Sequence, residues 1–230
     1  MDNARLMNLF FGLIIMEIIS LFFGLNFLHL ISNIVAAPLI LFIYLRIVKL
    51  NYKWYFILLF TALYATDLFH LIVDLDINNL FCAYLNSFAY AVLIHFTLKE
   101  MEFKRLKELD FIFYLSLLLV VFLYAYILYV VNEILLEQKV ENYLTFVIYA
   151  LLMFFMCVLI TIKYIIKPNI SNTSLQIAIA CFVISDLFYL ISIIYDQIIM
   201  FKYLFLIPQL AVYYFLLKYE LNRNKIFEIR

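Results

Sequence analysis

Long, continuous apolar runs are the feature that most restricts how this chain can fold. Eight segments reach the roughly 20 residues that a helix needs to cross the hydrocarbon core of a bilayer. They cover about residues 6–24, 27–47, 54–74, 79–98, 110–131, 143–166, 173–195 and 199–218. Strands are excluded, because the runs do not alternate and lipid offers backbone groups no partner outside a helix or a closed barrel. The sequence therefore predicts an all-α integral membrane protein with eight transmembrane helices.

The composition leads to the same class of protein. Of the 230 residues, 69% are hydrophobic and 14% are charged, which is too little charge for the surface of a soluble domain. The formal net charge is zero and no block of like charge stands out, so nothing suggests a nucleic-acid partner. Cys82, Cys157 and Cys181 are isolated within apolar runs and resemble buried hydrophobes. We predict one membrane domain over residues 1–230.

The distribution of basic residues predicts the orientation. If the N-terminus is inside, the cytoplasmic segments hold fourteen of the sixteen Lys and Arg residues, and the outer loops hold only Lys139 and Lys202. Cytoplasmic loops of membrane proteins carry an excess of Lys and Arg. Both termini are therefore predicted to be cytoplasmic. We expect a multi-pass protein of a bacterial inner (cytoplasmic) membrane.

An internal repeat is indicated by a shift of 119 positions. It aligns residues 65–99 with 184–218 without a gap, and ten of the 35 positions are identical, Asp67 and Asp186 among them. The third and seventh predicted spans run in the same direction, so the repeat is parallel, with its pseudo-two-fold axis along the membrane normal. We expect helices 1–4 and 5–8 to form the two halves, at about residues 1–105 and 106–230. If both aspartates face that axis, they face each other.

Three carboxylates are predicted at one depth. Asp67 and Asp186 each lie two or three residues beyond the centre of their span, about 3 to 5 Å toward the outer face at a helical rise of 1.5 Å per residue. Glu17 lies at a similar depth in the first span. Polar residues at comparable levels, or one turn away, are Asn33, His70, Asn86, Ser87, Ser185 and Gln209.

Buried carboxylates are costly, which favours a functional interpretation. One at a helix centre costs about 2.5 to 3.5 kcal/mol on insertion scales, and such residues usually face a bundle interior or a wet cavity. The alternative is that protonated Asp and Glu side chains hydrogen-bond across helices, for about 0.6 kcal/mol on average. His70 is either a proton-transfer partner of Asp67 or an ordinary interfacial side chain. The remaining histidines, His29 and His95, are expected at the ends of their spans.

Two adjacent carboxyls suit acid–base chemistry. Because like charges repel strongly in a low dielectric, such a pair holds one proton, giving one acid and one base. An acid beside a group that orients water is what hydrolysis of an acid-labile bond needs. No HExxH, P-loop, GxGxxG or GxSxG motif is present. A zinc site of Asp67, Asp186 and His70 is a minor alternative, so no metal and no cofactor is expected.

The eight-span plan resembles the YhhN-like membrane proteins, the family that contains the lysoplasmalogenases. Ser185-Asp186 and Gln209 match the family's Ser-Asp in span seven and Gln in span eight, and Thr66-Asp67 stands at its Gly-Asp. Pro38 matches the proline of its Lys-Pro, with Ala37 at the lysine. Val92 falls at the family histidine, with His95 a turn further on.

The resemblance implies hydrolysis of the vinyl ether of a lysoplasmalogen, with release of a fatty aldehyde. Asp67 and Asp186 would be the catalytic pair. Glu17, Asn33, His70, Asn86, Ser185 and Gln209 would support them or contact the single-chain lysophospholipid.

Two other classes of function stay open. One is a non-enzymatic protein, either a proton-coupled transporter or a lipid-binding sensor, because repeats and midplane acids also occur in transporters. The other is a catalytically silent member of the same family. Binding of the lipid without turnover would distinguish them from the hydrolase. The oligomeric state does not follow from the sequence.

Overall fold

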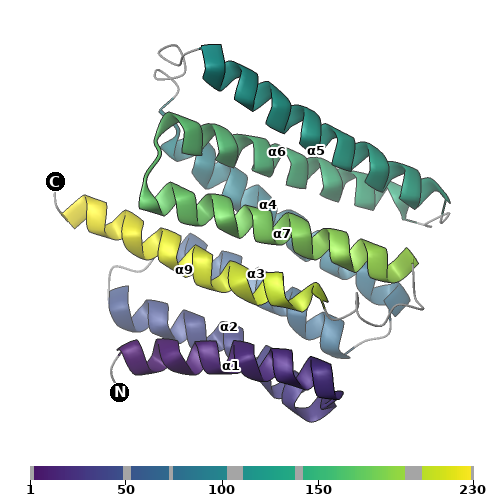
Figure 1. Ribbon diagram of the computed structural model, residues 1–230, viewed down its shortest axis with the longest axis vertical. Coiled ribbons are helices and arrows are strands. Elements are labelled where there is room, and N and C mark those ends of the chain that lie inside the picture. Colours follow the sequence, from purple (N-terminus) through teal and green to yellow (C-terminus); the bar gives the residue numbers. More distant parts are fainter. Residues whose placement is uncertain are drawn as a thin grey trace. The chain divides into compact units, whose positions relative to one another are not determined.

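The computed structural model describes residues 3–48, 53–72, 75–102, 111–137, 142–194 and 204–228. Every regular element in this part of the chain is a helix (Figure 1). The helices are α1 (Asn3–Phe23), α2 (Asn26–Val48), α3 (Trp54–Ile72), α4 (Leu75–Glu100), α5 (Phe111–Glu137), α6 (Tyr143–Ile166), α7 (Ile170–Ile194) and α9 (Leu206–Glu228). The all-α prediction is confirmed for these residues.

Six of these helices are long and apolar enough to cross a membrane: α1, α2, α4, α5, α6 and α7. The apolar part of α3, Trp54–Phe69, is shorter. The helix α9 is not among the six, and its second half carries Lys218, Glu220 and Arg223. The structure thus supports a multi-pass membrane protein, while the count of eight spans stays a prediction.

The helix bounds agree best with the predicted spans where polar residues flank the apolar run. Span six was predicted at about 143–166, and α6 is Tyr143–Ile166. The prediction for span five was too short, because α5 continues past 131 to Glu137 through Asn132, Glu133 and the residues "ILLE". The eighth predicted span overlaps α9, which begins at Leu206; residues 195–203 lie outside the described part.

The chain divides into two compact units. One comprises Met1–Phe60 with Thr173–Arg230, and the other comprises Thr61–Asn172. In the first unit α1, α2 and α9 pack against one another. In the second unit α6 packs against both α4 and α5. The predicted repeat halves, 1–105 and 106–230, follow a different division and stay a prediction.

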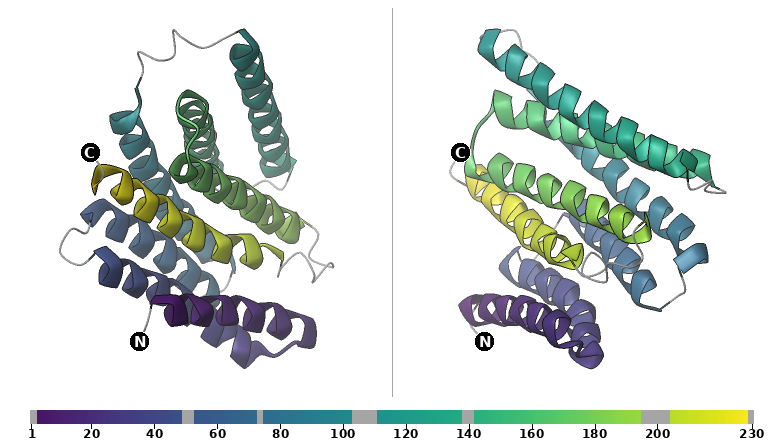
Figure 2. Two further views of the ribbon diagram at one scale, coloured as in Figure 1. Left: turned by 60° about the vertical axis from the view of Figure 1, so that its left-hand side comes forward. Right: turned by 45° about the vertical axis from the view of Figure 1, so that its right-hand side comes forward.

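A tight turn makes an antiparallel hairpin of α1 and α2, which lie side by side in all views (Figures 1 and 2). The helix α1 ends at Gly24, whose φ of 65° lies in the left-handed region that glycine adopts without steric cost. The N–H of Leu25 then donates to Ser20 O at 2.9 Å, and the N–H of His29 donates to Leu25 O at 3.1 Å. This turn places the last two turns of α1 beside the first two turns of α2.

In the second unit, two ion pairs connect the C-terminal ends of α4 and α6. Lys163 Nζ lies 2.7 Å from Glu100 Oε2, and Lys167 Nζ lies 3.0 Å from Glu102 Oε1. The N-terminus of α7 follows directly. Asn169 Oδ1 accepts a hydrogen bond from the backbone N–H of Asn172 at 2.7 Å, which caps the new helix.

Candidate functional site

Glu17 is the best-defined buried carboxylate in the described residues. Its side chain is 0% exposed, and it lies in α1 two turns before the Gly24 turn. His29 Nδ1 lies 2.6 Å from Oε1, and Asn33 Nδ2 donates to the same oxygen at 3.0 Å. The hydroxyl of Ser32 donates to Oε2. Since three groups of α2 converge on two oxygens, the hairpin stabilises a carboxylate within an apolar helix pair.

The spacing along α2 explains how one helix supplies all three groups. Residues three and four apart lie on the same face of a helix, and Ser32 and Asn33 stand three and four residues after His29. The sequence interpretation named Glu17 and Asn33 but not this cluster. It missed Ser32, and it placed His29 at the end of its span. The polar i, i+3, i+4 pattern in α2 was the available signal.

Asp67 lies in α3 and is half-buried. Its carboxylate is close enough to Tyr64 and Cys82 to interact with them electrostatically. The preceding residue, Thr66, is buried, and its hydroxyl lies 3.1 Å from both Ala62 O and Asn86 Oδ1. The thiol of Cys82 points to Thr66 O at 3.8 Å. Asn86, predicted to support the site, is therefore bonded to the residue next to Asp67.

Asp186 has a comparable setting in α7. It is half-buried, and the preceding residue, Ser185, is buried. The hydroxyl of Ser185 donates to Phe205 O at 2.9 Å. The ring of Phe205 in turn contacts Tyr189, with 5.7 Å between the ring centroids. Ser185, another predicted supporting residue, thus connects α7 to the segment that leads into α9.

The two hydrogen bonds before the aspartates occupy corresponding positions of the predicted repeat. Thr66 bonds to the residue 20 positions later, Asn86, and Ser185 bonds to the residue 20 positions later, Phe205. A shift of 119 positions converts one pair into the other. Both donors are hydroxyls, although the acceptors differ, since Asn86 uses its side chain and Phe205 its backbone carbonyl.

The buried face is also repeated. In α3 up to Asp67 the buried residues are Tyr55, Phe56, Leu59, Phe60, Ala62, Leu63 and Thr66. The same shift leads to Ser174, Leu175, Ala178, Ile179, Cys181, Phe182 and Ser185, and all of these except Cys181 are buried. Since an aspartate follows directly in each case, Asp67 and Asp186 stand at the same place relative to a buried helix face.

For the remaining predicted site residues, the structure describes only some of the side chains and contacts. Asp67 belongs to the unit of residues 61–172 and Asp186 to the other unit, so their pairing stays a prediction. The side chain of His70 lies outside the described residues. Gln209 is half-buried in α9, one turn from its start. Among the described residues, no group of three or more His, Cys, Asp or Glu side chains gathers in a way that would hold a metal ion.

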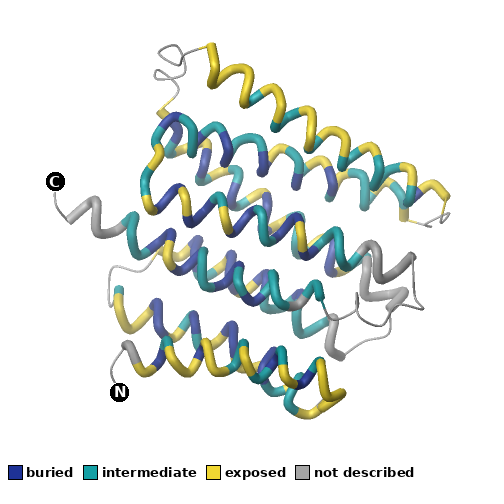
Figure 3. Tube along the Cα trace, in the orientation of Figure 1, coloured by how far each residue is buried: buried dark blue, intermediate teal, exposed yellow. Residues whose placement is uncertain are grey.

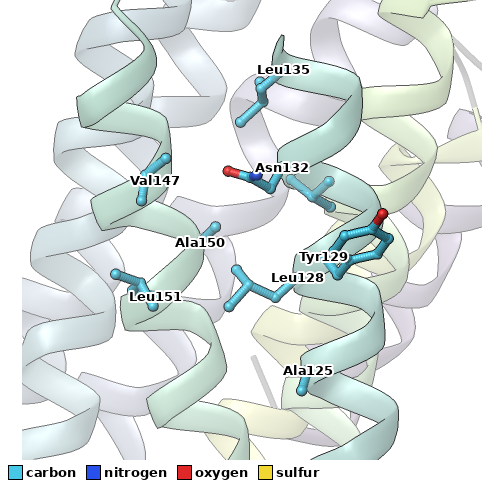
Figure 4. A pocket seen from close by; sticks show the side chains of 9 residues that line it. Ala125, Leu128, Tyr129, Asn132, Leu135, Val147, Ala150 and Leu151 are labelled. Carbon is cyan, nitrogen blue, oxygen red and sulfur yellow. The ribbon is translucent and has the colours of Figure 1, made fainter. Parts of the chain in front are cut away.

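A cavity of about 250 Å³ lies between α5 and α6 (Figure 4). Its lining includes Leu128, Leu135, Ala150 and Leu151, and it is mainly apolar. Asn132 and Tyr129 bring polar groups to the lining, and Asn132 Oδ1 accepts a hydrogen bond from the hydroxyl of Tyr143 at 2.5 Å. None of the predicted site residues lines this cavity.

The helices and the buried polar groups define the class of the protein as a multi-pass helical membrane protein with ionisable groups inside its spans. Comparisons of the chain with protein-family models, with curated proteins and with solved structures found no match.

Proposed function

We propose that the protein is a membrane hydrolase in which Asp67 and Asp186 form one acid–base site. The observation that carries the proposal is the equivalence of the two aspartates. Each follows a buried hydroxyl residue that is hydrogen-bonded to the residue 20 positions later. This equivalence supports a parallel repeat, and a two-fold axis along the membrane normal would bring the two carboxyl groups to the same depth.

The topology belongs to the same proposal. It has eight spans, with α3 and α9 as the third and eighth, and both termini in the cytoplasm of a bacterial cell. The excess of Lys and Arg in the alternate loops supports this orientation. Reporter fusions at the two termini test it: activity of a periplasm-specific reporter at either terminus would exclude the proposed orientation.

The substrate is a lysophospholipid with a vinyl ether chain, as the resemblance to the lysoplasmalogenases implies. One aspartic acid transfers its proton to the vinyl carbon, and water held by the other carboxylate adds to the resulting cation. The hemiacetal then collapses to a fatty aldehyde and the glycerophospho alcohol. The proton released by the water restores the acid. No covalent intermediate with the protein is needed.

The test is release of aldehyde from lysoplasmalogen by the purified protein in detergent. Asp67→Asn and Asp186→Asn should each abolish turnover, because an amide neither donates the proton nor orients water as a carboxylate does. The matched control is Glu133→Gln, which makes the same chemical change at an exposed position of α5 and should leave turnover unchanged. A wild-type protein that binds the lipid and releases no aldehyde would exclude the hydrolase and favour a transporter or a sensor.

A further inference from the structure

The cavity between α5 and α6 lies within one compact unit, and its walls are mainly apolar. Ala125 and Ala150 contribute only methyl groups to the lining, which leaves room between the two helices (Figure 4). The volume is about 250 Å³. Apolar protein cavities of about 150 Å³ stay dry and take up apolar molecules such as benzene. This cavity therefore suits an apolar guest better than water.

The position of Asn132 along α5 places a polar group near the edge of the hydrocarbon core. The helix has 27 residues, and at a rise of about 1.5 Å per residue it is longer than the core, which is about 30 Å thick. Asn132 stands eight residues beyond the middle residue, Tyr124, or about 12 Å along the helix. For an upright helix centred in the bilayer, this is just inside the core edge at about 15 Å, next to the ester groups of the lipids. Ala125 lies beside the middle, so the cavity extends from the ester level toward the bilayer centre.

The amide of Asn132 offers a hydrogen-bond donor at this level. Its Oδ1 accepts a hydrogen bond from the Tyr143 hydroxyl at 2.5 Å, which fixes the orientation of the amide. Nδ2 carries two hydrogens, and among the described residues neither has an acceptor. An amide donor in an apolar surrounding is costly unless it is hydrogen-bonded. The other polar lining residue, Tyr129, is 59% exposed, and its hydroxyl is directed away from α6 (Figure 4).

We propose that this cavity binds one acyl chain of an ester-linked membrane phospholipid. Nδ2 of Asn132 donates to the ester carbonyl, and the chain lies between α5 and α6 toward the middle of the bilayer. A phospholipid is the occupant because α5 exposes its apolar side chains to lipid, with no residue of its most apolar stretch buried. The site is independent of the proposed hydrolase. Neither Asp67 nor Asp186 lines the cavity, and a vinyl ether chain has no ester carbonyl for Asn132.

The test is photo-cross-linking of the full-length protein in phosphatidylcholine vesicles. One probe is a phosphatidylcholine with a diazirine in an ester-linked acyl chain. The matched probe carries the same chain on an ether, which lacks the carbonyl oxygen. Mass spectrometry of peptides maps the labelled residues. We expect the ester probe to label Leu128 and Val147, on the two walls of the cavity, more than Leu123, which is 52% exposed and does not line it.

The two probes separate the chain from its ester group. The ether probe should label the cavity residues about threefold less, as expected for an average hydrogen bond inside a membrane. Equal labelling by both probes would exclude the contact between Asn132 and the ester. Equal labelling of Leu128 and Leu123 would mean that lipid chains only surround α5, and it would overturn the proposal. These comparisons use the wild-type protein and need no folded variant.

Two substitutions test the two parts of the site. Asn132→Leu removes the amide at similar volume, so the difference between the probes should disappear while the ether probe still labels the cavity. Ala150→Leu fills the cavity, so labelling of Leu128 should fall to the level of Leu123 with both probes. The matched control is Ala91→Leu, the same change at an exposed position of α4, and it should leave the labelling unchanged. Unchanged labelling in Ala150→Leu would place the chain outside the cavity.

Discussion

At the scale of the residue, the environment of Glu17 shows how an apolar helix pair accommodates a carboxylate. The oxygens of Glu17 are satisfied by side chains that follow it within 16 residues of sequence. A buried donor or acceptor that loses its partner costs about 1 to 3 kcal/mol. The hydrogen bonds therefore stabilise both the carboxylate and the geometry of the hairpin.

Replacing Glu17 should destabilise the protein. Glu17→Leu removes the shared acceptor of His29, Ser32 and Asn33, and we expect a loss of about 1 to 3 kcal/mol in the free energy of unfolding. Unfolding by sodium dodecyl sulfate in mixed micelles measures it. Ser20→Ala is the control and should cost about 1 kcal/mol or less. Equal stability of Glu17→Leu and the wild type would contradict the observed network.

The sequence was sufficient to find the polar residues and insufficient to find their partners. Glu17 and Asn33 were recognised because a charge or an amide in an apolar run is costly wherever it lies. Their contact depends on the exact turn at Gly24, which decides which face of α2 meets α1. A lone histidine near the end of an apolar run carries no such information, so the contact of His29 with Glu17 followed only from the structure.

At the scale of the element, the helices α3 and α7 present similar buried faces, and in each a buried hydroxyl residue precedes an aspartate. Interhelical hydrogen bonds inside membranes contribute about 0.6 kcal/mol on average. They are therefore better at fixing a helix rotation than at stabilising the whole molecule. In both helices that rotation decides where the next residue, Asp67 or Asp186, is directed.

The predicted repeat implies matched effects of two substitutions. Thr66→Val and Ser185→Ala each remove the hydroxyl that bonds to the residue 20 positions later, and each should cost about 0.6 kcal/mol of unfolding free energy. For the first pair, a double-mutant cycle with Asn86→Ala should give a coupling energy of the same size. The control is Ser116→Ala, whose exposed hydroxyl bonds only to Ile112 O of its own helix among the described contacts. A coupling energy of zero would show that Thr66 and Asn86 do not interact.

The helix bounds themselves were mostly predictable, since apolar runs and flanking charges determine them. The prediction for α6 was correct at both ends, where Asn142 and Lys167 flank the run. The prediction for α5 ended too early, because its last turns mix apolar residues with Asn132 and Glu133. Helical hydrogen bonding continues through such residues once the backbone is already in a helix.

At the scale of the whole molecule, the exposed apolar side chains indicate whether water or lipid is the more favourable surrounding for the helices. In α5 no residue of its most apolar stretch is buried, and most of the helix is exposed (Figure 3). Exposed side chains such as Leu118, Leu119 and Phe122 would be unfavourable in water. They are favourable if the helix lies in lipid, which agrees with the six apolar helices.

This surface predicts a depth-dependent effect of a single lysine. Leu123 and Leu136 are 52% and 51% exposed, but Leu123 lies at the middle of α5 and Leu136 beside its end. Leu123→Lys should therefore lower insertion by about 2.5 to 3.5 kcal/mol. Leu136→Lys should be tolerated, because a lysine near a helix end reaches the interface with its ammonium group. Glycosylation mapping of α5 in microsomes measures both. Equal insertion of the two variants would mean that α5 is not surrounded by lipid.

The self-contained hairpin has a consequence for how the chain is made. When α1 leaves the ribosome, Glu17 has no hydrogen-bond partner. Its partners on α2, which are His29, Ser32 and Asn33, are synthesised 12 to 16 residues later. If α1 enters lipid alone, no hydrogen bond offsets the free-energy cost of the Glu17 carboxylate. The α1–α2 pair lowers this cost, because side chains of α2 bond to the carboxylate. We therefore expect α1 to wait at the translocon until α2 has emerged, so that biogenesis begins with two helices released together. A nascent chain truncated after α1 should then fail to integrate, and one truncated after α2 should succeed.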